Sequence, residues 1–526
     1  MWKIILLPMA ATAFGFSQEA ELLRFYQAAG ERPVWVQDGR ATPRAREVIN
    51  LLEHAETKGL DARDYDGPNW ASRLATVENH ESQDLMQFDI ALTDAVMRYV
   101  SDLREGRANP GLYRRAGRDS QVPLSTLIRK NVLDAADLSV SLREMEPTYP
   151  AYRRTLEALA QYRSLAPEHA GRRFPAVTEP VEPGDTYPAM PELARLLRAL
   201  GDLPPEAVPP AGSRTYTAAA ADSVKRFQAR HGLEADGRIG AATLAQLNTP
   251  LRDRVAQLEL ALERWRWLPR TFSHPPVLVN LPEFRLRALD STLQTVLEMK
   301  IVVGAARRTP TPLLAGELNQ VIFQPPWNVP LSIQRGELLP EIKRHPEYLA
   351  AHGYEVTTSR GEVVTSDVVS AGALARLRSG EFLLRQVPGP KNALGLVKFL
   401  FPNEASVYLH DTPAKALFAK VRRDFSHGCV RLENATEFAA WVLGEDPVWS
   451  REGIIAAMNG SETVQVNPPK PIPVMMTYMT AVVLETGEVR FLADLYGYDA
   501  ELEKQLAGRA AKTAATSGAP GLRPSE

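Results

Sequence analysis

The sequence has 526 residues but only one cysteine, almost no net charge and no long apolar run. Lys and Arg number 61 against 63 Asp and Glu, so no charge excess favours nucleic acid or an anionic membrane surface. We therefore expect no nucleic-acid partner. With 44% hydrophobic and 24% charged residues, the composition is that of globular domains, of which a chain of this length holds about two to four.

The most apolar stretch lies at the N-terminus, where Lys3 is followed by small and apolar residues from Ile4 to Phe16. These 13 residues are too few for a helix that spans a hydrocarbon core of about 30 Å. A positive start followed by a short apolar core is typical of a secretory signal. We predict a signal peptide at residues 1–17 and a periplasmic protein, with a buried N-terminal helix as the alternative.

Export changes the meaning of the single cysteine, Cys429. Exported proteins usually pair or lose their cysteines, and one cysteine cannot form an internal disulfide. A retained thiol is either an inert buried side chain or a reactive group. Its neighbours in "FSHGCVRLENATEF" decide between these alternatives.

Hydrophobic periodicity and proline content divide the chain into segments of different character, which predicts a multi-domain α+β fold. Residues 18–180 have helical periodicity and end in a proline-rich stretch, and 181–248 form a small three-helix module. A connecting helix covers 249–276. Residues 277–490 alternate like strands of a sandwich or barrel, with a helical cap insertion at about 328–388. Because residues 507–526 hold a single bulky apolar side chain, we expect 491–526 to be mostly disordered.

A cysteine nucleophile needs a base, because a free thiol is mostly protonated at neutral pH. Two histidines are near in sequence, His427 and His410. If "SVYLH" is a strand, Tyr408 and His410 point to the same face, and a histidine at a strand end can face a thiol on a neighbouring turn.

The residues around the thiol offer further groups for this chemistry. Gly428 permits a tight turn whose N–H groups can point at an oxyanion. Arg431 can hold a substrate carboxylate or form a plain surface ion pair. A helix is expected to begin at Asn434 with Glu437 completing a capping box, but it begins too far from Cys429 for its dipole to matter much.

The segment "HDTPAKALFAKVRRDFSHGCVRL" resembles the signature of the L,D-transpeptidase (YkuD-type) family. Also, "PPWNVP", "PGPKNALGLVKFLFPN" and "FYQAAGERPVWV" are similar to the large, multi-domain Gram-negative (YcbB-like) branch of that family. A second resemblance, to a peptidoglycan-binding helical module, lies in residues Val224, Phe227, Gln228, His231, Gly232, Leu233, Asp236, Gly237, Ile239, Gly240, Thr243 and Leu244.

The family resemblance implies a role for each residue of the motif. Cys429 is the nucleophile and His410 its base, oriented by the backbone carbonyl of Asp411. The resemblance assigns the oxyanion site to Ser426, His427 and Gly428, and substrate or cap contacts to Arg431, Tyr408, Trp327 and Asn392. It implies no cofactor and no metal.

The implied reaction is acyl transfer from a tetrapeptide stem of peptidoglycan through a Cys429 thioester, which forms 3→3 cross-links. Expected partners are peptidoglycan stem peptides and other wall-synthesis enzymes, with the chain itself a monomer. Water or a protein amine as acceptor would instead give an L,D-carboxypeptidase or a protein-to-wall attachment enzyme. Two alternatives from other classes are a non-catalytic peptidoglycan-binding protein and a zinc site built from His410, His427 and Cys429.

Overall fold

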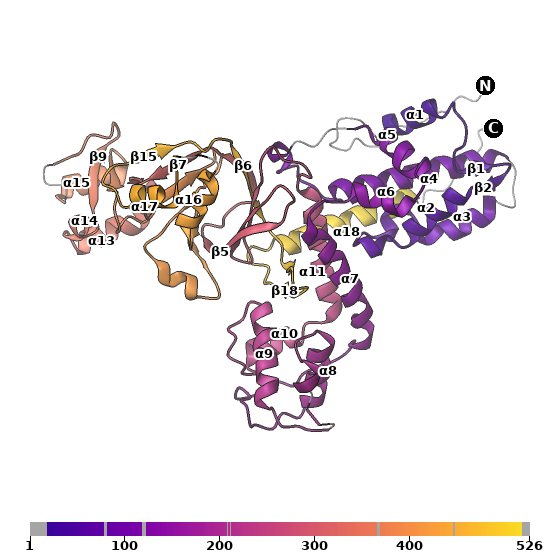
Figure 1. The fold of residues 1–526 in the computed structure, drawn as a ribbon, viewed down its shortest axis with the longest axis horizontal. Helices are drawn as coiled ribbons and strands as arrows, with labels where there is room; N and C mark the ends of the chain where they lie inside the picture. The colour runs from indigo at the N-terminus through magenta and orange to yellow at the C-terminus, as the bar shows by residue number, and fades with distance from the viewer. Residues whose placement is uncertain are drawn as a thin grey trace. The chain divides into compact units, whose positions relative to one another are not determined.

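The computed structural model describes residues 18–77, 82–117, 122–207, 209–210, 212–365, 369–444, 446 and 448–517. The predicted signal peptide at 1–17 lies outside these residues. The chain divides into two compact units. The helical unit comprises Met1–Thr271 and Tyr478–Glu526, and the sheet unit comprises Phe272–Thr477. Figure 1 shows the elements of both.

The first part of the helical unit is an α-helical body with one short hairpin, β1 (Val36–Gln37) and β2 (Arg40–Ala41). Its helices are α1 (Gln18–Ala28), α2 (Pro43–Glu53), α3 (Trp70–Val77), α4 (Ser82–Glu105), α5 (Leu124–Ile128), α6 (Leu138–Met145) and α7 (Pro150–Glu168). Helix α4 is central because its predicted apolar stripe is buried against its neighbours, including Leu92, Ala95, Val96 and Leu103. Asp89 on α4 accepts hydrogen bonds from the amides of Val34 and Trp35 and from the Tyr26 hydroxyl.

Three helices with their own core form the predicted small module: α8 (Met190–Ala199), α9 (Ala218–Arg230) and α10 (Ala241–Leu247). Thr217 caps α9 by accepting a hydrogen bond from the Ala220 amide. The buried Gln228 side chain donates to the Arg238 carbonyl and accepts from the Gly237 amide, which holds the turn before α10. These helices and the β-rich sheet unit confirm the predicted fold class.

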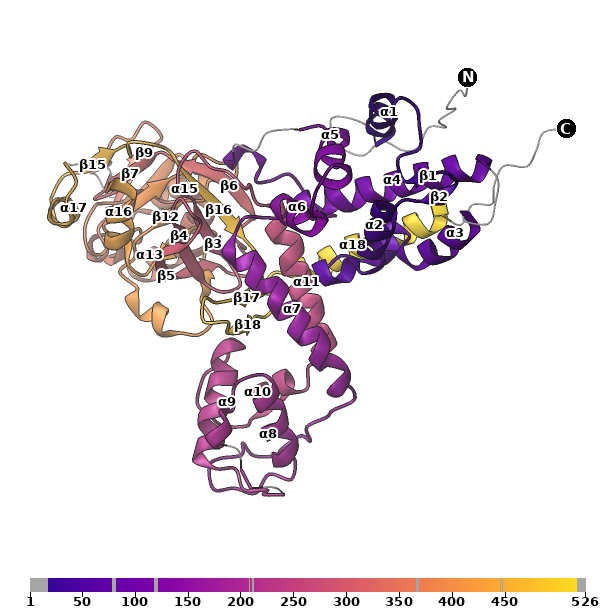
Figure 2. The same cartoon turned by 45° about the vertical axis from the view of Figure 1, so that its right-hand side comes forward.

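The helix predicted to connect the module with the β-rich part is α11 (Leu251–Trp267), and it packs along α7 (Figure 2). The hairpin of β17 (Ala481–Val483) and β18 (Val489–Phe491) packs there too, with β17 against both helices. The Phe491 ring lies edge-on to Tyr162 of α7, 5.1 Å between centroids. The β-rich unit therefore ends at Thr477, which corrects the boundary predicted at residue 490.

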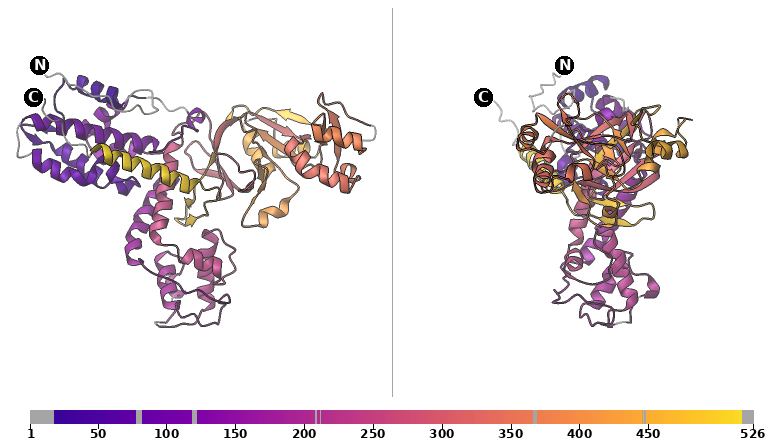
Figure 3. Two further views of the ribbon diagram at one scale, coloured as in Figure 1. Left: turned by 180° about the vertical axis from the view of Figure 1, so that it is seen from behind. Right: turned by 90° about the vertical axis from the view of Figure 1, so that its left-hand side faces the viewer.

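The C-terminal segment corrects the prediction of a mostly disordered tail, because α18 runs over Tyr498–Ser517. Figure 3 shows α18 lying along other helices of its unit. Alanine, lysine and glutamate, which are frequent in this segment, are strong helix formers, and Leu502 near its start is buried. Asp499 in its first turn pairs with Arg264 of α11, and Arg509 donates to Asp102 of α4 over 2.7 Å.

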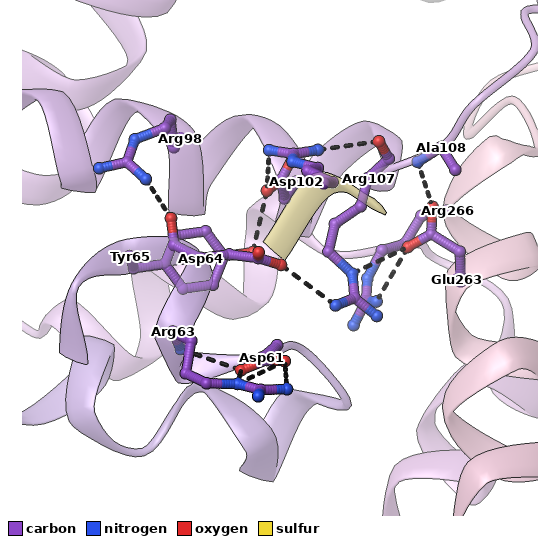
Figure 4. A network of polar contacts seen from close by, with 11 residues as sticks. Asp61, Arg63, Asp64, Tyr65, Arg98, Asp102, Arg107, Ala108, Glu263 and Arg266 are labelled. Atoms are coloured by element: carbon purple, nitrogen blue, oxygen red, sulfur yellow. Dashed lines mark hydrogen bonds and ion pairs between the residues drawn. The ribbon is translucent and has the colours of Figure 1, made fainter. Parts of the chain in front are cut away.

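Asp102 belongs to a buried polar network in the helical unit (Figure 4). Its carboxylate accepts from the Tyr65 hydroxyl over 2.9 Å. Nearby, Arg107 pairs with Asp64 at 3.2 Å and faces Glu263 of α11 at 3.8 Å. Charged groups, and not only apolar contacts, thus join α4, α11 and α18.

The sheet unit is built on one curled sheet whose strands follow the order β15-β7-β11-β12-β14-β5-β4-β3-β16-β6, with β13 beside β5. Neighbours are antiparallel except β12 with β14, β3 with β16 and β13 with β5. The strands are β3 (Val277–Asn280), β4 (Arg285–Leu289), β5 (Thr295–Gly304), β6 (Leu314–Leu318), β7 (Gln320–Phe323), β11 (Val397–Leu400), β12 (Leu409–His410), β13 (Asp424–Ser426), β14 (Val430–Leu432), β15 (Val464–Val466) and β16 (Ile472–Thr477). Helices α16 (Ala435–Leu443) and α17 (Arg451–Met458) follow β14.

The cap insertion is a compact body with its own hydrophobic core. Its small sheet has the order β8-β10-β9 and comprises β8 (Trp327–Asn328), β9 (Tyr354–Thr358) and β10 (Phe382–Gln386). Its helices are α12 (Leu331–Ile333), the π-helix η7 (Gln334–Leu338), α13 (Leu339–Arg344), α14 (Tyr348–Ala351) and α15 (Ala371–Ser379). Gln334 joins these parts, because its buried amide donates to the Leu377 and Phe382 carbonyls and accepts from the Leu384 amide.

Candidate active site

The motif residues gather on one face of three adjacent strands, β11, β12 and β14. His410 of β12 pairs with Lys398 of β11 and, in parallel register, with Arg431 of β14. Cross-strand partners point to the same face, so these three side chains form one row. Tyr408 and Cys429 precede His410 and Arg431 by two residues, and the two-residue period brings them to that face as well.

The thiol of Cys429 is hydrogen-bonded to both the backbone and the hydroxyl of Tyr408. The Tyr408 hydroxyl also takes a hydrogen bond from the Trp327 side chain, whose indole N–H can only donate. Trp327 packs on the core of the cap insertion, so the contact joins the cap to the thiol. Of the four residues assigned to substrate or cap contacts, Tyr408 therefore touches the thiol and Trp327 touches Tyr408.

Burial raises the pKa of the Cys429 thiol above its ordinary value, although the hydrogen bonds of Tyr408 and the charges of Arg431 and Lys398 lower it in part. Desolvation penalises the thiolate, and here it outweighs the hydrogen bonds and positive charges that favour it. The thiol is consequently protonated in the resting site at neutral pH.

The imidazole of His410 is buried and neutral. Burial, together with the Arg431 charge, lowers its pKa to about 4, against the opposing influence of the Asp411 and Leu394 backbone. Its Nδ1 lies 2.5 Å from the Asp411 carbonyl oxygen. A carbonyl only accepts, so Nδ1 carries the proton and Nε2 keeps the unshared pair that can take up another. This contact is the one that the family resemblance implies for the carbonyl of residue 411.

The turn before Cys429 is held by hydrogen bonds within the motif. The buried Ser426 hydroxyl donates to the Cys429 carbonyl at 2.5 Å and accepts from the Gly428 amide at 3.1 Å. Gly428 has φ of 115°, a left-handed conformation that side chains disfavour. The Gly428 amide was predicted to point at an oxyanion, but it already donates to the Ser426 hydroxyl and is not free to do so. The Cys429 amide has no acceptor among the residues that the structure describes.

The loop after β5 supports this turn through residues that the sequence did not single out. Thr311 is fully buried, accepts from the Gly304 amide at 2.9 Å and donates to the Gly428 carbonyl at 2.8 Å. Thr309 donates to the Ser426 carbonyl at 2.9 Å. No local motif marks these threonines, because their partners lie more than a hundred residues away in sequence.

The side chain of His427 points to the cap insertion. Its Nε2 lies 2.5 Å from Glu337 of η7, and both side chains are exposed. The prediction placed His427 along the oxyanion site, whereas here it joins the motif to the cap. His410, His427 and Cys429 do not form a ligand set, since within the described ranges no three His, Cys, Asp or Glu side chains gather as for a metal ion.

Arg431 and Asn392, both predicted to contact substrate, differ in whether their N–H groups are free to donate a hydrogen bond to it. Arg431 stands in the row with His410, and its buried Nε has no hydrogen-bond partner in the part of the chain that the structure describes. Asn392 is buried, and its amide donates to the Pro325 and Val387 carbonyls and accepts from the Leu394 amide. Both of its N–H groups are thus used within the protein, which corrects the prediction of a substrate contact.

The helix after the motif begins where the sequence predicts. Asn434 is the N-terminal cap of α16, but its side chain makes no capping hydrogen bond, and Glu437 instead pairs with Arg451 at 2.7 Å. The capping box is therefore not formed.

Comparison with protein families agrees with this geometry. Residues 276–449 match the family YkuD, "L,D-transpeptidase catalytic domain", and residues 186–247 match a "Putative peptidoglycan binding domain". Residues 20–159 match a "Scaffold domain". The chain therefore contains an L,D-transpeptidase catalytic domain of the YkuD type together with a peptidoglycan-binding domain.

Two individual proteins were compared with the chain. The "Putative L,D-transpeptidase" of Haemophilus influenzae is 32% identical over 247 residues, which are 47% of this chain and 48% of the relative. The chain thus matches about half the length of that protein. A solved L,D-transpeptidase from Xylanimonas cellulosilytica has 16% identity and a TM-score of 0.17, over 58% of this chain and 100% of that one.

In the part of the chain that the structure describes, no helix has the length and apolarity needed to cross a membrane.

Proposed function

We propose that the protein is an L,D-transpeptidase of the periplasm that forms 3→3 cross-links in peptidoglycan through a thioester at Cys429. The observation that carries the proposal is the parallel register of β12 and β14, which gives His410 and Cys429 the same face within a matched L,D-transpeptidase domain. The peptidoglycan-binding domain supports the substrate class.

The first half-reaction cleaves a tetrapeptide stem after its third residue. The Cys429 proton passes to Nε2 of His410 as the sulfur attacks the carbonyl carbon, which gives a tetrahedral oxyanion. When this intermediate collapses, the amide C–N bond breaks and the imidazolium returns its proton to the departing D-alanine. Because the resting thiol and imidazole are both neutral, proton transfer accompanies the attack.

The second half-reaction transfers the acyl group to an amine on the third residue of another stem. Its nitrogen attacks the thioester and gives a proton to His410, the C–S bond breaks, and Cys429 recovers that proton. A covalent intermediate divides one amide exchange into two easier steps. The Cys429 amide, which lacks a partner in the described chain, is the donor best placed for the oxyanion.

Mass spectrometry of the purified full-length chain incubated with disaccharide-tetrapeptide tests the proposal. We expect a cross-linked dimer that lacks one alanine. Cys429→Ala should abolish this product, and His410→Ala should reduce its rate by about 10²- to 10⁴-fold because the general base is lost.

Ser461→Ala, at an exposed position in the same unit, is the matched control and should retain activity. Tripeptide as the sole product would show that water is the acceptor. Cross-linking that survives in Cys429→Ala would refute the thioester, and loss of activity in His427→Ala alone would mean that the two imidazoles are reversed.

A further inference from the structure

Lys398 is a cation of the candidate site to which the motif assigns no function. It is the β11 member of the row that also contains His410 and Arg431. Its Nζ lies 5.9 Å from the centroid of the Tyr408 ring, and the Tyr408 hydroxyl bonds to the Cys429 thiol. The ammonium group is therefore on the same face as the nucleophile and next to the tyrosine that contacts it.

Neither cation of the row has an acidic partner within the described residues. Lys398 is half-buried and forms no ion pair there, and the buried Nε of Arg431 has no hydrogen-bond partner. Desolvation lowers the pKa of Lys398 while the Cys429 thiolate would raise it. Partial burial of a cation without a counter-ion raises the free energy of the folded protein, because the charge loses solvent. A bound anion would compensate the positive charges of Lys398 and Arg431.

We propose that Lys398 binds the terminal carboxylate of the donor stem and so selects stems that end one residue after the scissile bond. The inference rests on the proposed function. In such a donor, only the amide nitrogen and one α-carbon separate this carboxylate from the carbonyl carbon that Cys429 attacks. A cation beside the thiol is within reach of that group.

The other carboxylate that a diamino acid can carry lies at the far end of its side chain. It is too distant from the attacked carbon to be the natural partner of a cation placed at the nucleophile. A lysine ammonium is also a compact charge on a flexible stem, which suits a group that must leave after the acylation step. The resting Cys429 thiol does not serve as the anion, because burial keeps it protonated.

The test compares two donors of equal length, a disaccharide-tetrapeptide with a free terminal carboxylate and the same molecule as its terminal carboxamide. We expect the unmodified protein to prefer the free acid by about 10- to 100-fold in kcat/KM, the usual worth of a charged hydrogen bond. Lys398→Gln should lose this preference because its kcat/KM falls for the free-acid donor and not for the carboxamide. Lys398→Arg should keep part of the preference.

Lys343→Gln, at an exposed lysine of α13, is the matched control and should keep the full preference. The proposal is overturned if Lys398→Gln slows both donors equally, which would indicate an effect on the thiol or on folding, or if the variant still prefers the acid. Alkylation of Cys429 by iodoacetamide and the thermal unfolding midpoint separate those two effects. Turnover of neither donor by the unmodified protein would refute the proposed function itself.

Discussion

At the residue scale, the groups that we propose as nucleophile and base, Cys429 and His410, form a neutral pair. Burial raises the pKa of Cys429 and lowers that of His410 to about 4, so both shifts oppose a resting thiolate–imidazolium pair. The hydrogen bonds of Tyr408 and the charges of Lys398 and Arg431 are the groups that favour the thiolate.

The low pKa of His410 predicts the acid limit of activity. Below about pH 4 the imidazole is protonated and cannot accept the thiol proton, so kcat/KM should persist to about pH 5 and fall as pH approaches 4. Arg431 lowers this pKa, and Arg431→Gln should therefore move the acid limit to higher pH. Alkylation of Cys429 as a function of pH measures the limit independently of substrate binding. A limit near pH 6.5 in the unmodified protein would contradict the buried, neutral imidazole.

The sequence could indicate the residues that we propose to react but not all of their surroundings. Cys429 and His410 stand in a local signature, whereas Lys398, Thr309 and Thr311 reach the motif only through strand pairing. The register of β11 with β12 determines that Lys398, and not a neighbouring residue, shares the face of His410. Asn392 lies near a motif, yet it offers no N–H to a substrate, because its side-chain amide is bonded to the backbone around it. Sequence proximity alone does not reveal this.

At the element scale, the end of β5 and the loop after it hold the turn before Cys429. A Cβ on Gly304 would lie 2.0 Å from the Thr309 carbonyl oxygen, so this position has no room for a side chain. Gly304→Ala should push the loop away from Ser426 and Gly428, destabilise the sheet unit by about 1–3 kcal/mol and reduce activity strongly. Chemical denaturation and the dimer assay measure the two effects.

Gly336 of η7 provides the matched control, because a Cβ there meets nothing within 4 Å. Gly336→Ala should leave stability unchanged or raise it by up to about 1 kcal/mol, as alanine favours helix. Equal behaviour of the two alanine variants would show that the packing of Gly304 does not position the turn.

Elements with apolar periodicity could be predicted from the sequence, and those held by charges could not. The stripe on α4, the partial alternation in β5 and the short apolar runs of β3 and β16 indicate their structures directly. The second half of helix α18 holds few bulky apolar residues, and the helix is anchored by Asp499 and Arg509, whose partners are distant in sequence. The β17–β18 hairpin was assigned to the wrong unit for a related reason, since strand periodicity does not say which surface a hairpin covers.

At the scale of the whole molecule, the charge pair of Arg509 and Asp102 ties the last helix to the first domain. Burial raises the pKa of Asp102 to about 6, although Arg509 lowers it. Asp102 therefore binds a proton more tightly in the folded state than in the unfolded state. The free-energy cost of burying its charged form grows as pH rises from about 4 to 6 and stays constant at higher pH. Arg509→Gln removes the compensating charge, so it should destabilise the helical unit by about 1–3 kcal/mol at pH 7.5 and by less at pH 5.

Thermal unfolding of the full-length variant at both pH values measures this effect. Lys504→Gln, at an exposed position on α18, is the matched control and should change the midpoint little at either pH. A loss of stability for Arg509→Gln that is the same at both pH values would mean that Asp102 does not titrate in this range.

The sheet unit is inserted between α11 and the β17–β18 hairpin, so the helical unit is made from both ends of the chain. A ribosome delivers residues up to Thr271 long before residues 478–517. During that interval Asp102 and Arg264 have no Arg509 or Asp499 to meet. The N-terminal part of the helical unit therefore cannot complete its fold until translation is nearly finished. A premature stop within α18 would remove these ion pairs and destabilise the helices that were synthesised first.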